Sequence, residues 1–246
     1  MKINVLTLFP EMFTAVTTSS ILGRAAESGL LTITLTNIRD YTLDKHKRVD
    51  DTPFGGGVGM VMTADPIFRS LEATGASGKK AVYMSPRGKI LDHDKIKALS
   101  DEEELFILCG HYEGVDERIL GYWNMEEISI GDYILTGGEL AAMVLIDAVA
   151  RMIPNVLGES LSISEESIYS GLLEYPQYTK PRNYRGMDVP EVLTGGNHEL
   201  IRLWKLEQSL LLTKEKRPEL FENFILKNDQ LSKKEKQIIK KILEIT

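Results

Sequence analysis

The sequence predicts an α/β protein with a mainly parallel sheet, followed by a small all-helical C-terminal domain. Short β-rich runs alternate with helical runs through the first 150 residues. Several of the β-rich runs are continuously apolar, which is typical of strands that are covered on both faces. After residue 196 the pattern is helical only, so the sheet is expected to end before that point.

Five strands and four helices are expected in the first part of the chain. The first run, KINVLTLF, is a buried strand, and the helical run that follows it is closed by Gly29. The helix that starts after Gly138 stops before Pro154. The predicted strands are residues 2–9, 30–38, 80–85, 104–110 and 127–135, and the predicted helices are residues 11–29, 64–75, 93–100 and 139–152.

The stretch from Ile153 to Gly196 has no sustained period and is rich in Pro, Gly, Ser and Tyr, so it is expected to be a long linker or binding loop. Helical patterns return after residue 196, and each of three predicted helices begins at a helix-start signal. The signals are Asn197 as an N-cap, Pro218 at a helix start, and Ser232 with Glu235 as a capping box. The predicted division is residues 1–160 as the α/β domain, 161–175 as a flexible linker and 176–246 as the helical domain.

Composition limits the function classes. The single cysteine, Cys109, excludes an internal disulfide and fits a reducing cytoplasm, which is the expected location. The four histidines show no metal-ligand spacing, so no metal site is predicted. No apolar run approaches the roughly 20 residues that span a bilayer, so no membrane partner is expected.

Charge is distributed unevenly along the chain. The net charge is −7, yet residues 197–246 carry 11 Lys and Arg against 8 Asp and Glu. A basic end on an acidic body is compatible with a polyanionic partner.

Three glycine- or proline-bearing loops follow predicted strands: YMSPRG, CGHYEGVDER and SIGDYILTGGE. Ligands of open parallel sheets bind at the carboxyl ends of strands. Neither the phosphate-loop pattern nor the dinucleotide pattern occurs in the required place. These loops offer backbone amide and carbonyl groups and no basic side chain placed to hold a phosphate. As a ligand, S-adenosylmethionine is therefore favoured over ATP or NAD. The FGGGVGM loop (54–60) follows a charged stretch, and taken alone it is equally well a plain flexible loop.

Seven motifs occur in order along the chain: LTLFPEMF, VDDTPFGGGVGM, YMSPRGK, CGHYEGVDERI, SIGDYILTGGELAAMVLIDAVARMIP, GLLEYPQYTKP and GNHELIRLWKLEQSL. Together they closely resemble the bacterial tRNA (guanine-N1-)-methyltransferases of the SPOUT superfamily. The resemblance covers essentially the whole chain and is looser around residues 159–170 and toward the C-terminus. It implies a deep trefoil knot at the C-terminal end of the α/β domain, a topology that the general rule against threaded chains would not predict.

The resemblance also implies an activity and its partners. The expected reaction moves a methyl group from S-adenosyl-L-methionine to N1 of guanine 37, the base 3′ of the anticodon in tRNA. The expected partners are a tRNA anticodon stem-loop, held by the helical domain, and a second copy of the chain. The active sites are expected at the interface of this homodimer.

The site residues implied by the resemblance fall into three groups. The residues expected to surround the methyl donor are Tyr83, Pro86, Gly110, Tyr112, Glu113, Ile130, Gly131, Asp132, Tyr133, Ile134, Leu135, Gly137 and Gly138. Those expected around the target guanine are Asp50, Gly55, Gly56, Gly57 and Gly59. Those expected to hold phosphates are Arg39, Lys45, Lys47, Arg48, Lys180, Arg182, Arg185, Arg202 and Lys205.

Methylation of N1 removes a ring proton, so it calls for a general base and for a cation that stabilises charge on O6. Arg151 matches the family's catalytic arginine, but the family's aspartate base is replaced by Glu166, with Glu165 as the alternative. Glutamate keeps the carboxylate and adds one methylene. Whether Mg²⁺ assists is not readable from the sequence. Two other functions stay open: a non-catalytic tRNA-binding protein, and a small-molecule enzyme that uses ATP or NAD.

Overall fold

The computed structural model describes residues 1–157, 171–227 and 231–244. The chain forms two compact units, Met1–Ser160 and Leu161–Thr246. The described part of the chain contains no helix that is both long and apolar enough to cross a membrane.

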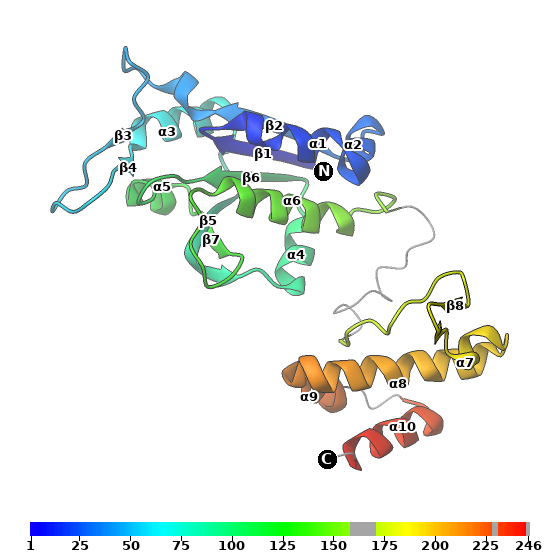
Figure 1. The fold of residues 1–246 in the computed structure, drawn as a ribbon. Helices are drawn as coiled ribbons and strands as arrows, with labels where there is room; N and C mark the ends of the chain where they lie inside the picture. The colour runs from blue at the N-terminus through cyan, green and yellow to red at the C-terminus, as the bar shows by residue number, and fades with distance from the viewer. Residues whose placement is uncertain (158–170, 228–230, 245–246) are drawn as a thin grey trace. The chain divides into compact units, whose positions relative to one another are not determined.

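A five-stranded sheet, in the order β2-β1-β6-β5-β7, forms the centre of the first unit (Figure 1). All four neighbouring pairs of strands run parallel, which confirms the predicted mainly parallel α/β sheet. Consecutive strands of such a sheet need crossover connections, and the helices supply them. The strands are β1 (Lys2–Thr7), β2 (Thr32–Asn37), β5 (Lys80–Ile90), β6 (Glu104–Cys109) and β7 (Glu126–Ser129).

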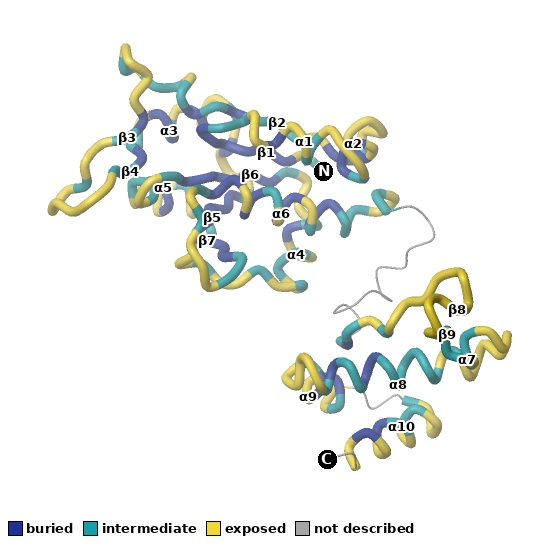
Figure 2. Tube along the Cα trace, in the orientation of Figure 1, coloured by how far each residue is buried: buried dark blue, intermediate teal, exposed yellow. Residues whose placement is uncertain are grey.

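Side chains of the central strands alternate between two hydrophobic clusters, so both faces of the sheet are covered. In β6, Leu105 and Ile107 belong to one cluster, while Phe106 and Leu108 belong to the other. Helices α2 (Ser20–Glu27), α4 (His93–Ser100) and α6 (Glu139–Met152) contribute to the first cluster; α3 (Ala64–Ala73) and α5 (Glu117–Tyr122) contribute to the second. Figure 2 shows the resulting buried centre of the unit.

The single helix predicted for residues 11–29 is wrong. The structure has a 3-10 turn η1 (Pro10–Phe13), a short α1 (Thr14–Thr18) and then α2. The break falls at Ser19, which is extended, and at Ser20, whose φ is +55°. Serine and threonine side chains compete for backbone hydrogen bonds, and the run TTSS therefore interrupts the helix.

Two further expectations are corrected by the structure. The strand predicted for residues 127–135 ends at Ser129, because Gly131 turns the chain with a φ of +149°. Helix α5 was not predicted at all, although Asp116 caps it by accepting from Arg118 N.

A small antiparallel hairpin, β3 (Asp50–Asp51) with β4 (Val61–Met62), carries the FGGGVGM loop. No strands were predicted for these residues. A second 3-10 turn, η2 (Ile38–Tyr41), follows β2 and precedes this hairpin.

The second unit contains α7 (Glu191–Thr194), α8 (His198–Lys216), α9 (Pro218–Lys227) and α10 (Lys233–Glu244). Asn197 caps α8 and Pro218 begins α9, as predicted. The unit also holds a hairpin of β8 (Asn183–Tyr184) and β9 (Met187–Asp188), so its described part is not all-helical. Its core includes Leu210, Phe221 and Ile242.

Candidate ligand site

A cavity of about 320 Å³ lies at the ends of β6 and β7, at the carboxyl edge of the sheet, and against residues 83–87 of β5. This volume lies in the range of small-molecule sites. All the residues predicted to surround a methyl donor line it, except Asp132. Three segments that are distant in the sequence therefore meet there. Residues 83–88 were predicted as a loop after a strand of residues 80–85, but they lie within β5, where its register with β7 shifts. That the three segments bind a methyl donor stays a prediction.

Glycines shape the wall of this cavity because their neighbours leave no room for a side chain. A Cβ on Gly110 would lie 2.6 Å from Tyr83 Oη. A Cβ on Gly138 would lie 2.9 Å from Cys109 Cα, which is backbone and cannot swing away. Gly138 N also donates to Gly110 O over 2.8 Å, so the loop after β6 and the start of α6 are joined directly.

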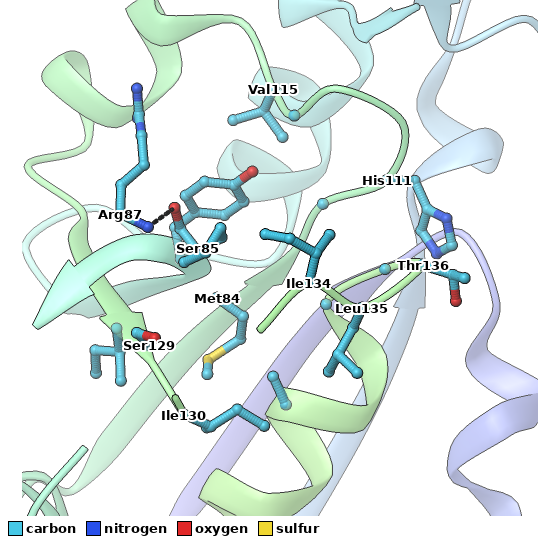
Figure 3. Close-up of a pocket in the computed structure, with 18 of the residues that line it drawn as sticks. Met84, Ser85, Arg87, His111, Val115, Ser129, Ile130, Ile134, Leu135 and Thr136 are labelled. Atoms are coloured by element: carbon cyan, nitrogen blue, oxygen red, sulfur yellow. Dashed lines mark hydrogen bonds between the residues drawn. The ribbon is translucent and has the colours of Figure 1, made fainter. Parts of the chain in front are cut away.

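The cavity combines an apolar side with a polar rim. Figure 3 shows Met84, Ile130 and Leu135 gathered around its floor, with Ile134 above them. Burial raises the pKa of the Tyr83 hydroxyl, so this ring stays neutral at physiological pH. Apolar surface combined with well-placed polar groups is typical of sites for small organic ligands.

Arg87 occupies the rim of the cavity, and the sequence analysis did not single it out. Its guanidinium contacts Glu127 and Glu117, each over 3.0 Å, and these hydrogen bonds raise its pKa. Ser85 Oγ accepts from Arg87 N, as Figure 3 shows. In the sequence, its place in YMSPRG, between the predicted site residue Pro86 and Gly88, was the signal that could have identified it.

His111 is a second residue that sequence reasoning missed, although both of its neighbours were predicted. It lines the cavity, and its ring nitrogen Nε2 lies 2.8 Å from Glu139 Oε2. Figure 3 draws it beside Thr136, on the side of the cavity opposite Arg87.

The residues predicted around the target guanine are only partly brought to this cavity. Glu113 N donates to Met60 O and Met62 N donates to Gly114 O, each over 2.9 Å, so β4 is bonded to the loop that lines the cavity. Gly59 lies against Glu113. Asp50 lies in β3, and Gly55, Gly56 and Gly57 have open space around them, with φ values of +88°, +77° and +128°. The end of the loop, at Gly59 and Met60, therefore lies next to the cavity, and the preceding glycines are exposed to solvent.

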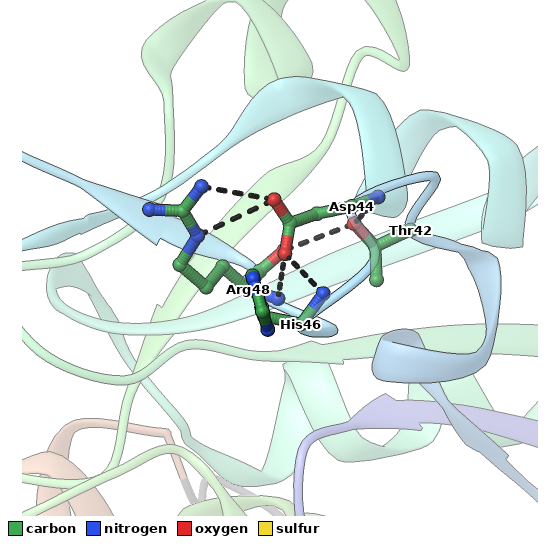
Figure 4. A network of polar contacts seen from close by, with 4 residues as sticks. All are labelled: Thr42, Asp44, His46 and Arg48. Atoms are coloured by element: carbon green, nitrogen blue, oxygen red, sulfur yellow. Dashed lines mark hydrogen bonds and ion pairs between the residues drawn. The ribbon is translucent and has the colours of Figure 1, made fainter.

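A polar network organises the turn that precedes this loop (Figure 4). Asp44 accepts from the backbone N–H groups of His46 and Arg48 and from the Arg48 guanidinium. Hydrogen bonds from Arg48 lower the pKa of Asp44 to about 2. The charge of Arg48 is thus already compensated, which weakens its prediction as a phosphate ligand. Lys47 likewise pairs with Asp40 over 3.5 Å.

Of the predicted catalytic residues, Arg151 lies in the described part of the chain. Arg151 lies in the last turn of α6 and is partly buried. Glu166 and its alternative Glu165 lie outside the described residues. Within the described ranges, no three His, Cys, Asp or Glu side chains are grouped as a metal site.

In the second unit, basic and aromatic side chains lie together. Lys205 Nζ lies 4.4 Å from the centre of the Tyr175 ring, and the Arg185 guanidinium lies 5.4 Å from that of Tyr184. Arg202 is paired with Glu235 over 2.5 Å. The phosphate roles of the remaining predicted basic residues stay predictions: Arg39, Lys45, Lys180 and Arg182.

The fold and this cavity define a class of protein: an α/β protein with a cavity of small-molecule size at the carboxyl edge of a parallel sheet, lined by glycine-bearing segments. The family model described as tRNA (Guanine-1)-methyltransferase TrmD matches residues 1–223. The chain therefore belongs to this family.

Three similar proteins, each named tRNA (guanine-N(1)-)-methyltransferase, align over nearly their whole length. The Clostridium perfringens protein is 53% identical over 232 residues, covering 94% of this chain and 98% of its own. The protein from Alkaliphilus oremlandii is 55% identical, covering 94% and 96%. The protein from Ruminiclostridium cellulolyticum is also 55% identical, covering 93% and 99%.

Proposed function

We propose that this protein is a tRNA (guanine-N1-)-methyltransferase that uses S-adenosyl-L-methionine and methylates N1 of guanine 37, 3′ of the anticodon. The observation that carries the proposal is that three of the motifs that resemble the family, those around residues 83–88, 109–118 and 129–141, line one cavity at the sheet edge. The names of the similar proteins support the same activity.

The cavity suits an adenosyl group because backbone, rather than side chains, forms much of its wall. Gly110, Gly137 and Gly138 place no side chain between the ligand and the main chain. Met84, Ile130 and Leu135 offer apolar surface for a purine ring and a thioether chain. When bound, the donor supplies an electrophilic methyl group.

The chain's own residues handle the proton and the charge on guanine. Glu166 is the proposed base that takes the N1 proton; a positioned base contributes a factor of about 10² to 10⁴. Arg151 is the proposed cation that stabilises the negative charge on O6. It lies in the last turn of α6, about 18 Å along the helix from the first turn that adjoins the cavity, so this role requires an active site shared between two subunits.

We propose that the chain threads here as the deep trefoil knot of the SPOUT superfamily. The segment after β7 lies against the loop after β6, where Gly137 forms an isolated antiparallel bridge with His111. It then enters α6, which packs against β1 and β6. This close pairing of the two loops, followed by a return against the inner strands, supports the proposed topology.

A homodimer with shared active sites is also proposed. Helix α6 exposes Leu140 and Val144, which are 50% and 49% exposed and lie one turn apart on one face. Met12 is 42% exposed. Apolar side chains on a helix face next to a ligand site are typical of an interface.

The helical unit is proposed to hold the tRNA anticodon stem-loop. Its aromatic rings and cations, such as Tyr175 with Lys205, offer stacking surface and positive charge to a nucleic acid. Because tRNA is the proposed substrate, the protein is expected to act in the cytoplasm.

The test is mass analysis of nucleosides from tRNA incubated with the protein and the methyl donor, with and without Mg²⁺. The expected product is 1-methylguanosine at position 37. Glu166→Gln and Arg151→Ala should each slow single-turnover methylation by about 10²-fold or more. Full activity of Glu166→Gln would reject its role as base.

A non-catalytic tRNA-binding protein is the second candidate, favoured by the glutamate where the family has aspartate. It predicts tRNA binding with no methyl incorporation under any of these conditions.

A further inference from the structure

Three polar side chains from separate segments meet beside the cavity and form one network. Thr7 ends β1, His111 lies in the loop after β6, and Glu139 is the first residue of α6. The Thr7 hydroxyl donates to Glu139 Oε1 over 2.6 Å, and His111 Nε2 lies 2.8 Å from Glu139 Oε2. Both oxygens of this carboxylate are therefore engaged.

The Glu139 side chain is almost completely buried, with an exposure of 1%. A buried carboxylate is costly unless it is hydrogen-bonded, and an apolar residue would fill the same space without that cost. Its place in the first turn of a 14-residue helix offsets part of the cost, since the helix dipole favours negative charge there. The arrangement therefore points to a need for defined geometry rather than for packing alone.

The network lies directly against the glycine loops of the cavity. A Cβ on Gly137 would lie 2.4 Å from His111 Nε2 and 2.6 Å from Glu139 Oε2, so both side chains touch this backbone. His111 is itself fixed from the other side, because its ring centroid lies 4.8 Å from that of Phe9. Phe9 N in turn donates to Thr7 Oγ1 over 2.9 Å.

We propose that Thr7, His111 and Glu139 form a positioning network that holds the two glycine loops at the spacing that admits the methyl donor. The inference rests on the proposed function, because it takes the cavity as the donor site. The network acts through the backbone of Gly110, Gly137 and Gly138 and not on the reacting atoms. It therefore governs donor affinity and leaves the rate of methyl transfer at saturating donor nearly unchanged.

The test is calorimetric titration of the full-length protein with S-adenosylhomocysteine, combined with single-turnover methylation of tRNA at saturating donor. His111→Leu should weaken binding about 10- to 100-fold, as expected for loss of a hydrogen bond to a charged group. In Thr7→Val, whose side chain belongs to the network and does not line the cavity, the rate at saturating donor should stay within about threefold of the parent. His111→Gln places an amide nitrogen near the position of Nε2 and should restore most of the affinity.

Two further variants keep the test decisive. Thr7→Val preserves shape, removes one donor to Glu139, and should weaken binding about threefold to tenfold even if His111→Leu does not fold. His198→Leu, at an exposed histidine of α8, is the matched control and should bind like the parent.

Parent-like affinity in folded His111→Leu and Thr7→Val would overturn the inference. So would equal weakness of His111→Leu and His111→Gln, or a fall in the saturated rate with affinity unchanged. If the parent itself gives no heat with S-adenosylhomocysteine, the proposed function fails and the inference falls with it. That outcome is distinct from an effect confined to the variants.

Discussion

Individual glycines in this protein have different reasons to be glycine, and the surroundings of each decide which. Gly88 lies in β5 where the register with β7 shifts, and a Cβ there would lie 2.3 Å from the carbonyl carbon of Glu127. Gly121 lies in α5 with open space around it and an ordinary helical backbone. At Gly88 the neighbouring backbone leaves no room for a side chain, whereas at Gly121 nothing excludes one.

Alanine at these two positions should therefore act in opposite directions. Gly88→Ala forces β5 and β7 apart and should lower the free energy of unfolding by about 1–3 kcal/mol, as overpacking does. Gly121→Ala should raise it by about 0.5–1 kcal/mol, because glycine is a poor helix former. Urea unfolding of both variants measures the two values. A neutral Gly88→Ala would mean that the strands yield without cost.

At the scale of elements, the sequence predicted what depends on long apolar runs or on capping chemistry. The five sheet strands and helices α3, α4 and α6 follow from such patterns. The prediction failed where the backbone conformation of one or two residues sets the end of an element. Gly131 ends β7, so that Ile134 and Leu135 line a cavity although their apolar character resembles a strand. Hairpin β3–β4 and helix α5 are too short to show a period.

The candidate site shows the same division between what a pattern contains and what only geometry reveals. The glycine loops could be predicted, because glycine at successive strand ends is visible in the sequence. The network around Glu139 could not, since Thr7 is 132 positions away from it in the chain. Nor could the pairing of Arg87, whose partners Glu117 and Glu127 come from other elements.

The start of α10 is an element whose stability should depend on pH. The hydroxyl of Ser232 and the guanidinium of Arg202 lower the pKa of Glu235 from 4.5 to about 2. The folded unit binds this proton more weakly than the unfolded chain, so the stabilisation is complete above pH 4.5 and is lost as the pH falls toward about 2.

Unfolding followed by the fluorescence of Trp204, in α8, should show this loss. Ser232→Ala should destabilise the unit by about 0.5–2 kcal/mol at neutral pH, because an N-cap is removed. Glu235→Gln should be less stable than the parent at neutral pH and should lose less stability on acidification. An unchanged pH profile in Glu235→Gln would assign the acid sensitivity to other carboxylates. Trp123, in the first unit, reports separately on the parallel sheet if Trp204 is replaced by Phe.

At the scale of the whole molecule, the proposed homodimer makes a prediction that neither unit makes alone. If a donor cavity and a base from different subunits form each active site, two inactive chains can complement one another. Gly138→Val fills the cavity against the backbone of Cys109, and Glu166→Gln removes the proposed base. In a mixed dimer one site combines the intact cavity with the intact base, while the other site has lost both.

Equal amounts of the two variants should be unfolded together and refolded. Half of the dimers are then mixed, and each mixed dimer has one intact site of two. The mixture should therefore recover roughly a quarter of the parent's methylation activity. Each variant refolded alone should stay inactive, and sedimentation should show that both are dimers. Val144→Asp, which places a charge on the exposed face of α6, should yield monomers and abolish complementation. A mixture that stays inactive although mixed dimers form would place cavity and base in the same subunit. The apolar face of α6 would then serve assembly alone.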